Sequence, residues 1–475
     1  MANKVKTIFA NMSWLMISQI LTSVCAFVWT ILMARYLGPT NYGIFGSAVS
    51  LTSLFGVFAS LGIFSYLVRG ISTDFENEAK YVNNTLGLKL FLSVFYMVIV
   101  FLVLIILGWD RYVIGISLLY AFEYLIKTFQ DVFYASFQAH EEIKYQAITY
   151  TIVTLLTFIF ILFVIFTDLG LLGITFAYIF ANFIALCYAV YAMRKHFIKP
   201  SFSFDFSFYK VLIKAGIPFA LTGFFYTIYY SIDIVMITQF LSTYSTGLYN
   251  SAYKLISVLA LFYTIYSAVI FPVMSKLFVD EKDLLNLSFV KSIKYLSFVT
   301  IPIAIFTAMY GYDIIAIYGA EFIEAGGVMK ILIWTVCFLF INGACSLILN
   351  ASHQEYSVTK IYSIAAVFNV VSNLVLIPLY DVYGAAIATV LSEILILFLQ
   401  LYMVRKIDQL PDRHLLYDIL KICFASGVLG VVLYALNLNM WFAMPVSLVV
   451  YFAAILLVRF IDSDDKLIIK QIIGK

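Results

Sequence analysis

Long apolar segments recur along this 475-residue chain, and each has about the 20 residues that a helix needs to cross a bilayer. Hydrophobic residues make up 64% of the chain and charged residues 12%, against about a half and a quarter in soluble domains. The predicted fold is therefore all-α, that of a polytopic membrane protein, since a helix satisfies its own backbone in lipid. About fourteen transmembrane helices are predicted, at residues 8–33, 44–68, 86–108, 112–136, 146–167, 169–193, 209–238, 247–273, 292–317, 328–350, 358–379, 382–404, 418–437 and 440–459.

Two internal similarities indicate that the chain contains a repeat. The similar segments are residues 34–55 with 238–259 and residues 168–184 with 379–395. The first pair aligns without gaps and places Gly43 on Gly247. Because each half would hold six helices, an even number, the two repeats are expected to run parallel about an axis along the membrane normal.

The longest polar connection of the first half, residues 193–209, is the natural boundary between the repeats. We therefore predict two pseudo-symmetric six-helix lobes, at 1–200 and 201–408. Two extra transmembrane helices and a cytoplasmic tail are predicted at 409–475.

The distribution of Lys and Arg predicts the orientation. With a cytoplasmic N-terminus, 24 of the 29 basic residues fall on the cytoplasmic side, as the positive-inside rule requires. An even number of helices then places both termini in the cytoplasm, in a multi-pass protein of the cytoplasmic (inner) membrane. The first apolar segment, from Ile8 to Met33, is too long for the core of a signal peptide and is expected to remain as a helix.

Several function classes find no support in the residues. The net charge is +3 without a basic block, which argues against a nucleic-acid partner. The five cysteines and four histidines lack the spacing of metal ligands, so buried inert thiols and solvated histidines are favoured and no metal site is predicted. No Walker loop, HExxH motif or nucleophile elbow occurs, so neither an enzyme nor a cofactor is predicted.

A few charged residues inside the apolar segments are the candidates for function, because each costs about 2.5–3.5 kcal/mol at the bilayer centre. Glu123, Lys127 and Asp131 are spaced i, i+4, i+8 and share one face of a helix. This face is either a self-neutralising ladder of charges or the wall of an aqueous cavity.

Asp233 and Lys254 lie in consecutive apolar segments. They form either a structural ion pair or a site in which Lys254 binds an anionic substrate. In the second case Asp233 would hold Lys254 or couple transport to an ion such as Na⁺ or H⁺. Arg35 ends the first predicted helix, where a lysine or arginine commonly snorkels to the outer interface.

Three polar residues of the second half are further candidates for lining a cavity. Glu393 lies in the twelfth predicted helix, and Asn369 and Asn373 lie one turn apart in the eleventh. Hydrogen bonding between helices is the favoured role of the two asparagines.

Four stretches, in this order along the chain, resemble the polysaccharide transporter (Wzx-type flippase) family. That family belongs to the superfamily of the MATE multidrug exporters and the lipid II flippase. The stretches are ARYLGPTNYGIFGSAVSL, IPFALTGFFYTIYYSIDIVMITQFLSTYSTGLYNSAYKL, IFPVMSKLF and LNASHQEYSVTKIYSIAAVFNVVSNLVLIPLYDVYGAAIATVLSEI. The resemblance covers roughly residues 5–405.

The resemblance implies a V-shaped pair of six-helix lobes around a central cavity. It implies movement of an undecaprenyl-(di)phosphate-linked oligosaccharide to the outer leaflet by alternating access, for cell-surface polysaccharide such as capsule or O-antigen. Arg35 and Lys254 occupy motif positions, so they are the first candidates to meet the diphosphate. The implied partners are the lipid-linked oligosaccharide, membrane lipid and other polysaccharide assembly proteins.

Two other functions remain open at this point. A cation-coupled multidrug antiporter of the same superfamily typically carries a carboxylate in its first helix, and the segment from Ile8 to Met33 has none. A polytopic glycan polymerase or ligase usually needs a large outer loop with catalytic acids or histidines. Here the predicted outer loops are short, and Glu321 and Glu324 are their only acidic cluster.

Overall fold

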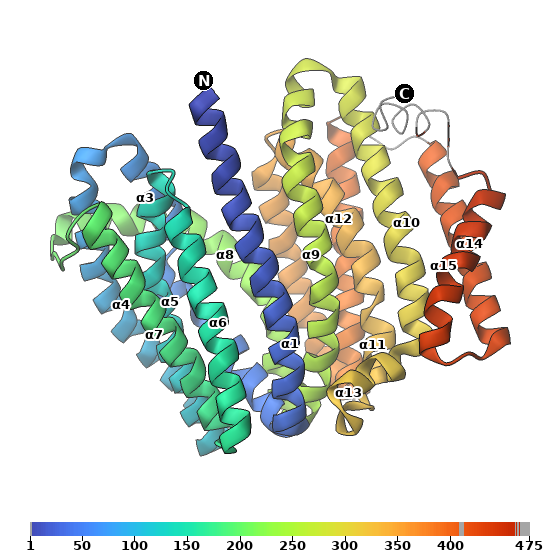
Figure 1. The fold of residues 1–475 in the computed structure, drawn as a ribbon, viewed down its shortest axis with the longest axis horizontal. Helices are drawn as coiled ribbons and strands as arrows, with labels where there is room; N and C mark the ends of the chain where they lie inside the picture. Colours follow the sequence, from blue (N-terminus) through green and yellow to red (C-terminus); the bar gives the residue numbers. More distant parts are fainter. Residues whose placement is uncertain (1, 408–412, 461, 463–464, 466–475) are drawn as a thin grey trace. The chain divides into compact units, whose positions relative to one another are not determined.

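A computed structural model describes residues 2–407, 413–460, 462 and 465, without the side chains of 2–20, 279–280, 282–283 and 413. Helices are the only regular elements in these ranges (Figure 1). They are α1 (Ala2–Phe55), α2 (Val57–Ser60), α3 (Ile63–Thr73), α4 (Glu78–Leu107), α5 (Arg111–Ala139), α6 (Lys144–Thr167), α7 (Gly170–His196), α8 (Phe206–Phe240), α9 (Thr243–Asp280), α10 (Lys282–Ile315), α11 (Ala325–Leu332), α12 (Trp334–Ala351), α13 (Glu355–Lys406), α14 (Arg413–Leu436) and α15 (Met440–Leu457), with short 3₁₀ helices at Phe75–Asn77, Ala316–Tyr318 and Ala320–Phe322.

Twelve helices of the described ranges are long and apolar enough to span a membrane. Two of them contain a break at a residue with positive φ, while α10 has only a kink at Tyr310, near its end. In α1 the break is at Gly38, which has φ of 68° and precedes a proline, and in α13 it is at Tyr380–Asp381, where Asp381 has φ of 53°. Counting the segments on both sides of each break gives fourteen, in the predicted order.

The predicted second span, 44–68, is not one continuous helix. Its first part is the end of α1, and the chain then continues through α2 and α3. Leu61 and Gly62, between α2 and α3, both adopt left-handed backbone conformations, with φ of 45° and 63°. A left-handed residue interrupts the helical hydrogen-bond ladder, which apolar length alone does not reveal.

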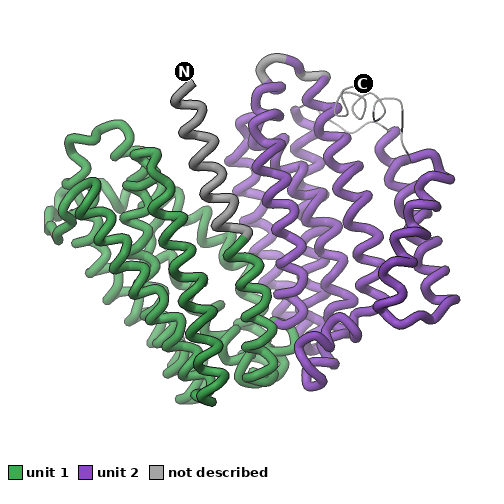
Figure 2. The backbone as a smooth tube through the Cα atoms, viewed as in Figure 1, with its two compact units in different colours: residues 1–250 green, residues 251–475 purple. Residues whose placement is uncertain are grey.

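The chain forms two compact units, residues 1–250 and 251–475, and the division falls inside α9 (Figure 2). The predicted lobes at 1–200 and 201–408 concern an internal repeat and stay a prediction. Most of the predicted cytoplasmic tail, at 466–475, lies outside the described residues.

The start of α9 belongs to the first unit because it crosses the second segment of α1 at very short range. A Cβ atom on Gly43 would lie 1.7 Å from the carbonyl oxygen of Thr243, and one on Gly247 would lie 1.9 Å from that of Pro39. The alignment that places Gly43 on Gly247 also places Pro39 on Thr243. The two contacts are therefore reciprocal, and the aligned segments meet at their aligned glycines.

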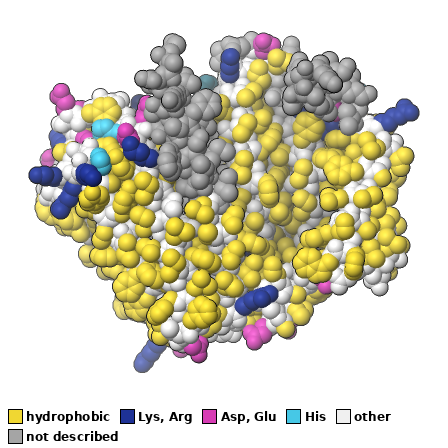
Figure 3. Space-filling view, viewed as in Figure 1, with side chains coloured by type: hydrophobic (Ala, Val, Ile, Leu, Met, Phe, Trp, Pro, Cys, Tyr) yellow, Lys and Arg dark blue, Asp and Glu magenta, His cyan; other side chains and the backbone are white. Residues whose placement is uncertain are grey.

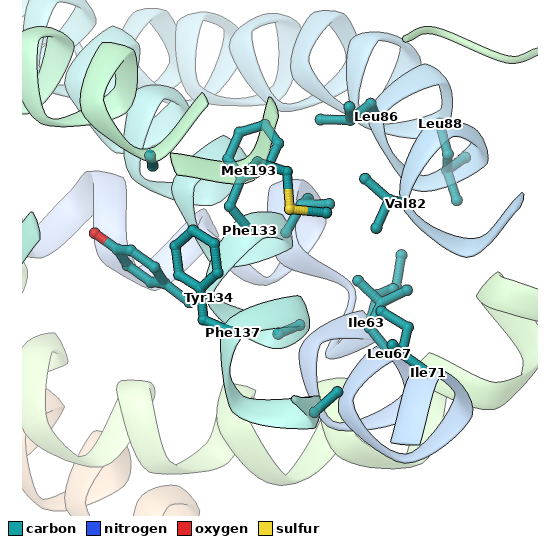
Figure 4. Packing of buried hydrophobic residues seen from close by; sticks show 14 of the residues in the cluster. Ile63, Leu67, Ile71, Val82, Leu86, Leu88, Phe133, Tyr134, Phe137 and Met193 are labelled. Carbon is teal, nitrogen blue, oxygen red and sulfur yellow. The ribbon is translucent and has the colours of Figure 1, made fainter. Parts of the chain in front are cut away.

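A core of the first unit lies among α3, α4, α5 and α7 (Figure 4). Its labelled side chains are Ile63, Leu67 and Ile71 of α3, Val82, Leu86 and Leu88 of α4, Phe133, Tyr134 and Phe137 of α5, and Met193 of α7. Lipid tails are as apolar as these side chains, so close packing rather than the hydrophobic effect favours this association within a membrane.

In the second unit, α14 and α15 pack on α10 through a core that includes Ile422, Leu429 and Tyr451. A cluster of charges strengthens this attachment beyond α15. Lys291 donates hydrogen bonds to Asp462 and Asp465 at 2.7 Å and 2.6 Å, and Lys294 donates to the same two carboxylates at 2.9 Å and 2.7 Å. Asp418 of α14 lies 3.1 Å from Lys294.

The outward surface of the helices is apolar. Hydrophobic side chains cover most of the visible face of each unit between its ends, and charged side chains gather toward the ends (Figure 3). Phe166 and Leu457, for example, are 85% and 84% exposed. Such a surface is stable against lipid, so the protein is a multi-pass membrane protein.

Candidate functional site

The first unit holds a buried carboxylate that contacts two other helical side chains. Glu123 of α5 is 4% exposed, and its Oε1 accepts hydrogen bonds from Lys127 at 2.7 Å and from Asn182 of α7 at 2.8 Å. Gln130, also of α5, donates to the backbone oxygen of Asn182 at 2.8 Å. The predicted attraction between Glu123 and Lys127 is therefore present, while a role of this face in a cavity stays a prediction.

Asp131, the third member of the predicted ladder, is half-buried and interacts electrostatically with Lys127 and with Lys89. Lys89 of α4 is buried and donates a hydrogen bond of 3.2 Å to the carbonyl oxygen of Ala59, near the end of α2. The sequence interpretation missed Lys89 as a buried charge. Its position inside the predicted span 86–108 was the feature that could have indicated a buried charge.

The second unit repeats the carboxylate–amide contact with the two residue types exchanged. Asn342 of α12 donates to Glu393 of α13 at 2.7 Å, and both side chains are buried. In the alignment of 168–184 with 379–395, Asn182 falls on Glu393. The earlier helix thus carries the Glu in the first unit and the Asn in the second.

The sequence interpretation found Glu393 but missed Asn182 and Asn342, because a neutral amide inside an apolar segment carries no charge that would mark it as a candidate. The alignment of Asn182 with Glu393 was the one feature that could have indicated its role. A buried carboxylate needs a donor, and an amide on the facing helix supplies one without a net charge.

Asp233 of α8 is also buried, and the hydroxyl of Tyr249, in α9, donates a hydrogen bond of 2.8 Å to its Oδ2. Both residues belong to the first unit. Lys254 belongs to the second unit, where its side chain is exposed and makes no hydrogen bond or ion pair with the described residues of that unit. A pair between Asp233 and Lys254 would join the two units and stays a prediction.

The remaining candidates lie near the two helix breaks. Arg35 is exposed, three residues before the break in α1. The next residue, Tyr36, donates to Asp168 at 2.9 Å and accepts from the backbone N–H of Gly170 at 2.7 Å. In α13, before its break, Asn373 donates to Asn369 at 3.0 Å within the same helix, and hydrogen bonding of the two asparagines between helices stays a prediction.

Membrane-length helices with internal breaks and buried carboxylates define a polytopic helical membrane protein. The structure matches that of the lipid II flippase MurJ in an inward closed conformation, with a TM-score of 0.77 and 16% sequence identity. The match covers 97% of this chain and 99% of that one, and at this identity it shows the fold.

The chain belongs to the polysaccharide biosynthesis protein family, whose model matches residues 8–278. The family model of the lipid II flippase MurJ matches residues 198–454. Capsular polysaccharide biosynthesis protein CapF of Staphylococcus aureus is 23% identical, over 84% of this chain and 99% of its own. Probable flippase AglR of Haloferax volcanii is 23% identical, over 61% of this chain and 60% of its own.

Proposed function

We propose that this protein is a flippase that moves a lipid-linked oligosaccharide from the inner to the outer leaflet of the cytoplasmic membrane, for cell-surface polysaccharide assembly. One observation carries the proposal. Two family models, one of polysaccharide biosynthesis proteins and one of a lipid II flippase, each match more than half of the chain. Together they extend from residue 8 to residue 454.

The physical task fits a protein of this kind. A diphosphate with attached sugars cannot cross about 30 Å of hydrocarbon unaided, because its polar groups would lose their hydration without compensation. A hydrated path through the helices removes that cost while the lipid tail stays in the bilayer. Alternating access between two states gives direction when an ion gradient, such as that of Na⁺ or H⁺, or consumption of the glycan biases them.

Within this proposal the exposed cations Arg35 and Lys254 meet the diphosphate of an undecaprenyl-(di)phosphate-linked oligosaccharide. Lys254 is assigned this role because an ammonium inside an apolar helix is tolerated where it faces water or an anion. Lys127 and Asp131 are placed on the same path, and the buried carboxylates of Glu123, Asp233 and Glu393 hold the surrounding helices. Both termini lie in the cytoplasm, where other polysaccharide assembly proteins act as partners.

Reconstitution tests the function and the site separately. The purified protein is placed in liposomes, and the arrival of a labelled undecaprenyl-diphosphate-linked oligosaccharide in the far leaflet is measured. We expect Lys254→Ala and Asp233→Ala to lower the rate at least tenfold with normal folding, and Lys360→Ala, which removes another exposed lysine of the second unit, to leave it unchanged. Absence of transport by the wild-type protein would reject the flippase, and full activity of both variants would reject the site.

A further inference from the structure

A cavity of about 400 Å³ lies within the first unit, where the connection from α4 to α5 meets the turn from α8 to α9. This volume is in the range of about 300–1,000 Å³ that small-molecule sites occupy. Trp109, Asp110, Tyr112, Gln239 and Thr243 contribute most of its aromatic and polar lining. None of the charged residues assigned to the path of the diphosphate lines it.

Two helix caps hold the aromatic part of this lining in place. Gly108 ends α4 in a left-handed conformation with φ of 66°, and the side chain of Asp110 accepts a hydrogen bond of 3.0 Å from the N–H of Tyr112 to begin α5. Trp109 is the single residue between these caps and packs on a core that includes Leu104 and Leu125. Its indole is therefore fixed before any ligand arrives.

The hydrogen bond of Trp109 determines which group of the Gln239 amide remains available to a ligand. The indole Nε1 donates to Oε1 of Gln239 at 2.9 Å. An indole N–H only donates, so the oxygen of Gln239 must face it, and the amide nitrogen is left as a donor for another group. A tryptophan that served only as an interfacial anchor would direct its N–H to water or lipid headgroups. Here the indole N–H donates to Gln239 instead.

These side chains match the chemistry of a pyranose sugar. A sugar ring has C–H bonds on its faces, which favour contact with the negative face of an aromatic ring, and hydroxyls on its rim. The amide of Gln239, the second carboxylate oxygen of Asp110 and the hydroxyl of Thr243 provide both donors and acceptors for such a rim. The predicted orientation places both connections at the outer side of the membrane, where a flippase releases its glycan.

We propose that this cavity is a subsite for one sugar residue of the glycan, used at the outer end of the transport path. This inference rests on the proposed function for the identity of the ligand. The residues that line the cavity, however, are suited to bind the sugar and not the diphosphate or the lipid. The two proposals can therefore fail independently of each other.

The test uses the glycan without its lipid. Lipid-linked oligosaccharides are extracted from membranes of the source organism, and mild acid releases the free glycan. Binding of that glycan to the full-length protein in detergent is measured by titration calorimetry. We expect saturable binding that weakens at least tenfold in Gln239→Ala and in Trp109→Ala and is unchanged in Trp441→Ala, whose tryptophan lies at the start of α15 in the other unit.

Gln239 is exposed and outside the core, so Gln239→Ala keeps the test decisive if Trp109→Ala does not fold. Absence of saturable binding to the wild-type protein, or undiminished binding by folded Gln239→Ala, would overturn the subsite. A polyol headgroup of a membrane lipid has similar hydroxyls, so phosphatidylglycerol vesicles are titrated in parallel with phosphatidylcholine vesicles. A Gln239-dependent response to phosphatidylglycerol but none to the free glycan would also overturn it. Transport of the intact lipid-linked oligosaccharide, measured separately, reports on the flippase proposal alone.

Discussion

At the scale of single residues, the two carboxylate–amide pairs are the most informative feature of the structure. Glu123 with Asn182 and Asn342 with Glu393 form the same contact between helices, with distances of 2.8 Å and 2.7 Å. Exchanging the two residues between facing helices preserves one donor, one acceptor and one buried charge. The contact, rather than the residue type at either position, is therefore what the two halves share.

An exchange experiment tests this interpretation in the second unit. Asn342→Glu places two carboxylates together, and Glu393→Asn removes the acceptor charge, so each single variant should lower thermal stability by several degrees and transport at least tenfold. The double variant restores the order found in the first unit, and we expect it to recover most of both losses. Melting temperature in detergent and transport in liposomes are the measurements, and additive losses in the double variant would contradict the interpretation.

At the scale of elements, the crossing of α1 and α9 depends on the absence of two side chains. Gly247→Ala would bring its new Cβ to 1.9 Å from the carbonyl oxygen of Pro39, so the helices must separate. Overpacking of this kind costs about 1–3 kcal/mol. We expect a clear fall in melting temperature and reduced transport, and the same from Gly43→Ala.

Gly115→Ala provides the matched control for the crossing. A Cβ at Gly115 of α5 would meet nothing within 4 Å, and alanine favours a helix by about 1 kcal/mol over glycine. This control should be neutral or slightly stabilising. If Gly247→Ala and Gly43→Ala behaved like Gly115→Ala, the close approach would not be a feature of the protein.

The attachment of the last two helices should depend on pH. Burial by itself would raise the pKa values of Asp462 and Asp465, but hydrogen bonds from Lys291 and Lys294 outweigh it and hold both values below the usual range. A carboxyl whose pKa is lowered by folding stabilises the folded state above its unfolded pKa of about 3.9. That stabilisation is lost as the pH falls through the folded values.

Asp465→Asn tests this dependence. At pH 7 we expect its melting temperature to lie several degrees below that of the wild-type protein, because two lysines lose a buried partner. The difference should stay constant down to about pH 5 and narrow below about pH 4. Glu76→Gln, at an exposed carboxylate of the first unit, should show no such difference, and a pH-independent gap for Asp465→Asn would be evidence against the ion pairs.

At the scale of the whole molecule, the predicted orientation places two exposed connections on opposite sides of the membrane, and this placement can be tested. Single cysteines are introduced at Ser201 and at Glu321 after replacement of the five native cysteines, two of which are buried and call for alanine. In right-side-out vesicles we expect an impermeant maleimide to label Glu321→Cys directly and Ser201→Cys only after permeabilisation. The reverse pattern would invert the topology and remove the sugar subsite from the outer side.

Much of the architecture could be predicted from the sequence because helix length and apolar character are local properties. The fourteen segments and their order follow from them, whereas the family and the alignment of Gly43 with Gly247 were predicted from matching residues along the chain. The division of 44–68 could not be predicted from these properties, because the left-handed conformation of Leu61 leaves the apolar length of the segment unchanged. The same limit applies to Lys89, whose place inside an apolar span did not reveal what it binds.

The sequence by itself determined that this chain is a helical membrane protein and which of its charges would have to be accommodated within the bundle. Only the tertiary structure decided which groups accommodate them: Asn182 for Glu123, Asn342 for Glu393, Tyr249 for Asp233. The physical reason is that a buried carboxylate is satisfied by whichever donor the neighbouring helix presents at about 2.8 Å. That depends on how two helices rotate and cross relative to each other, which the period of a single helix does not encode.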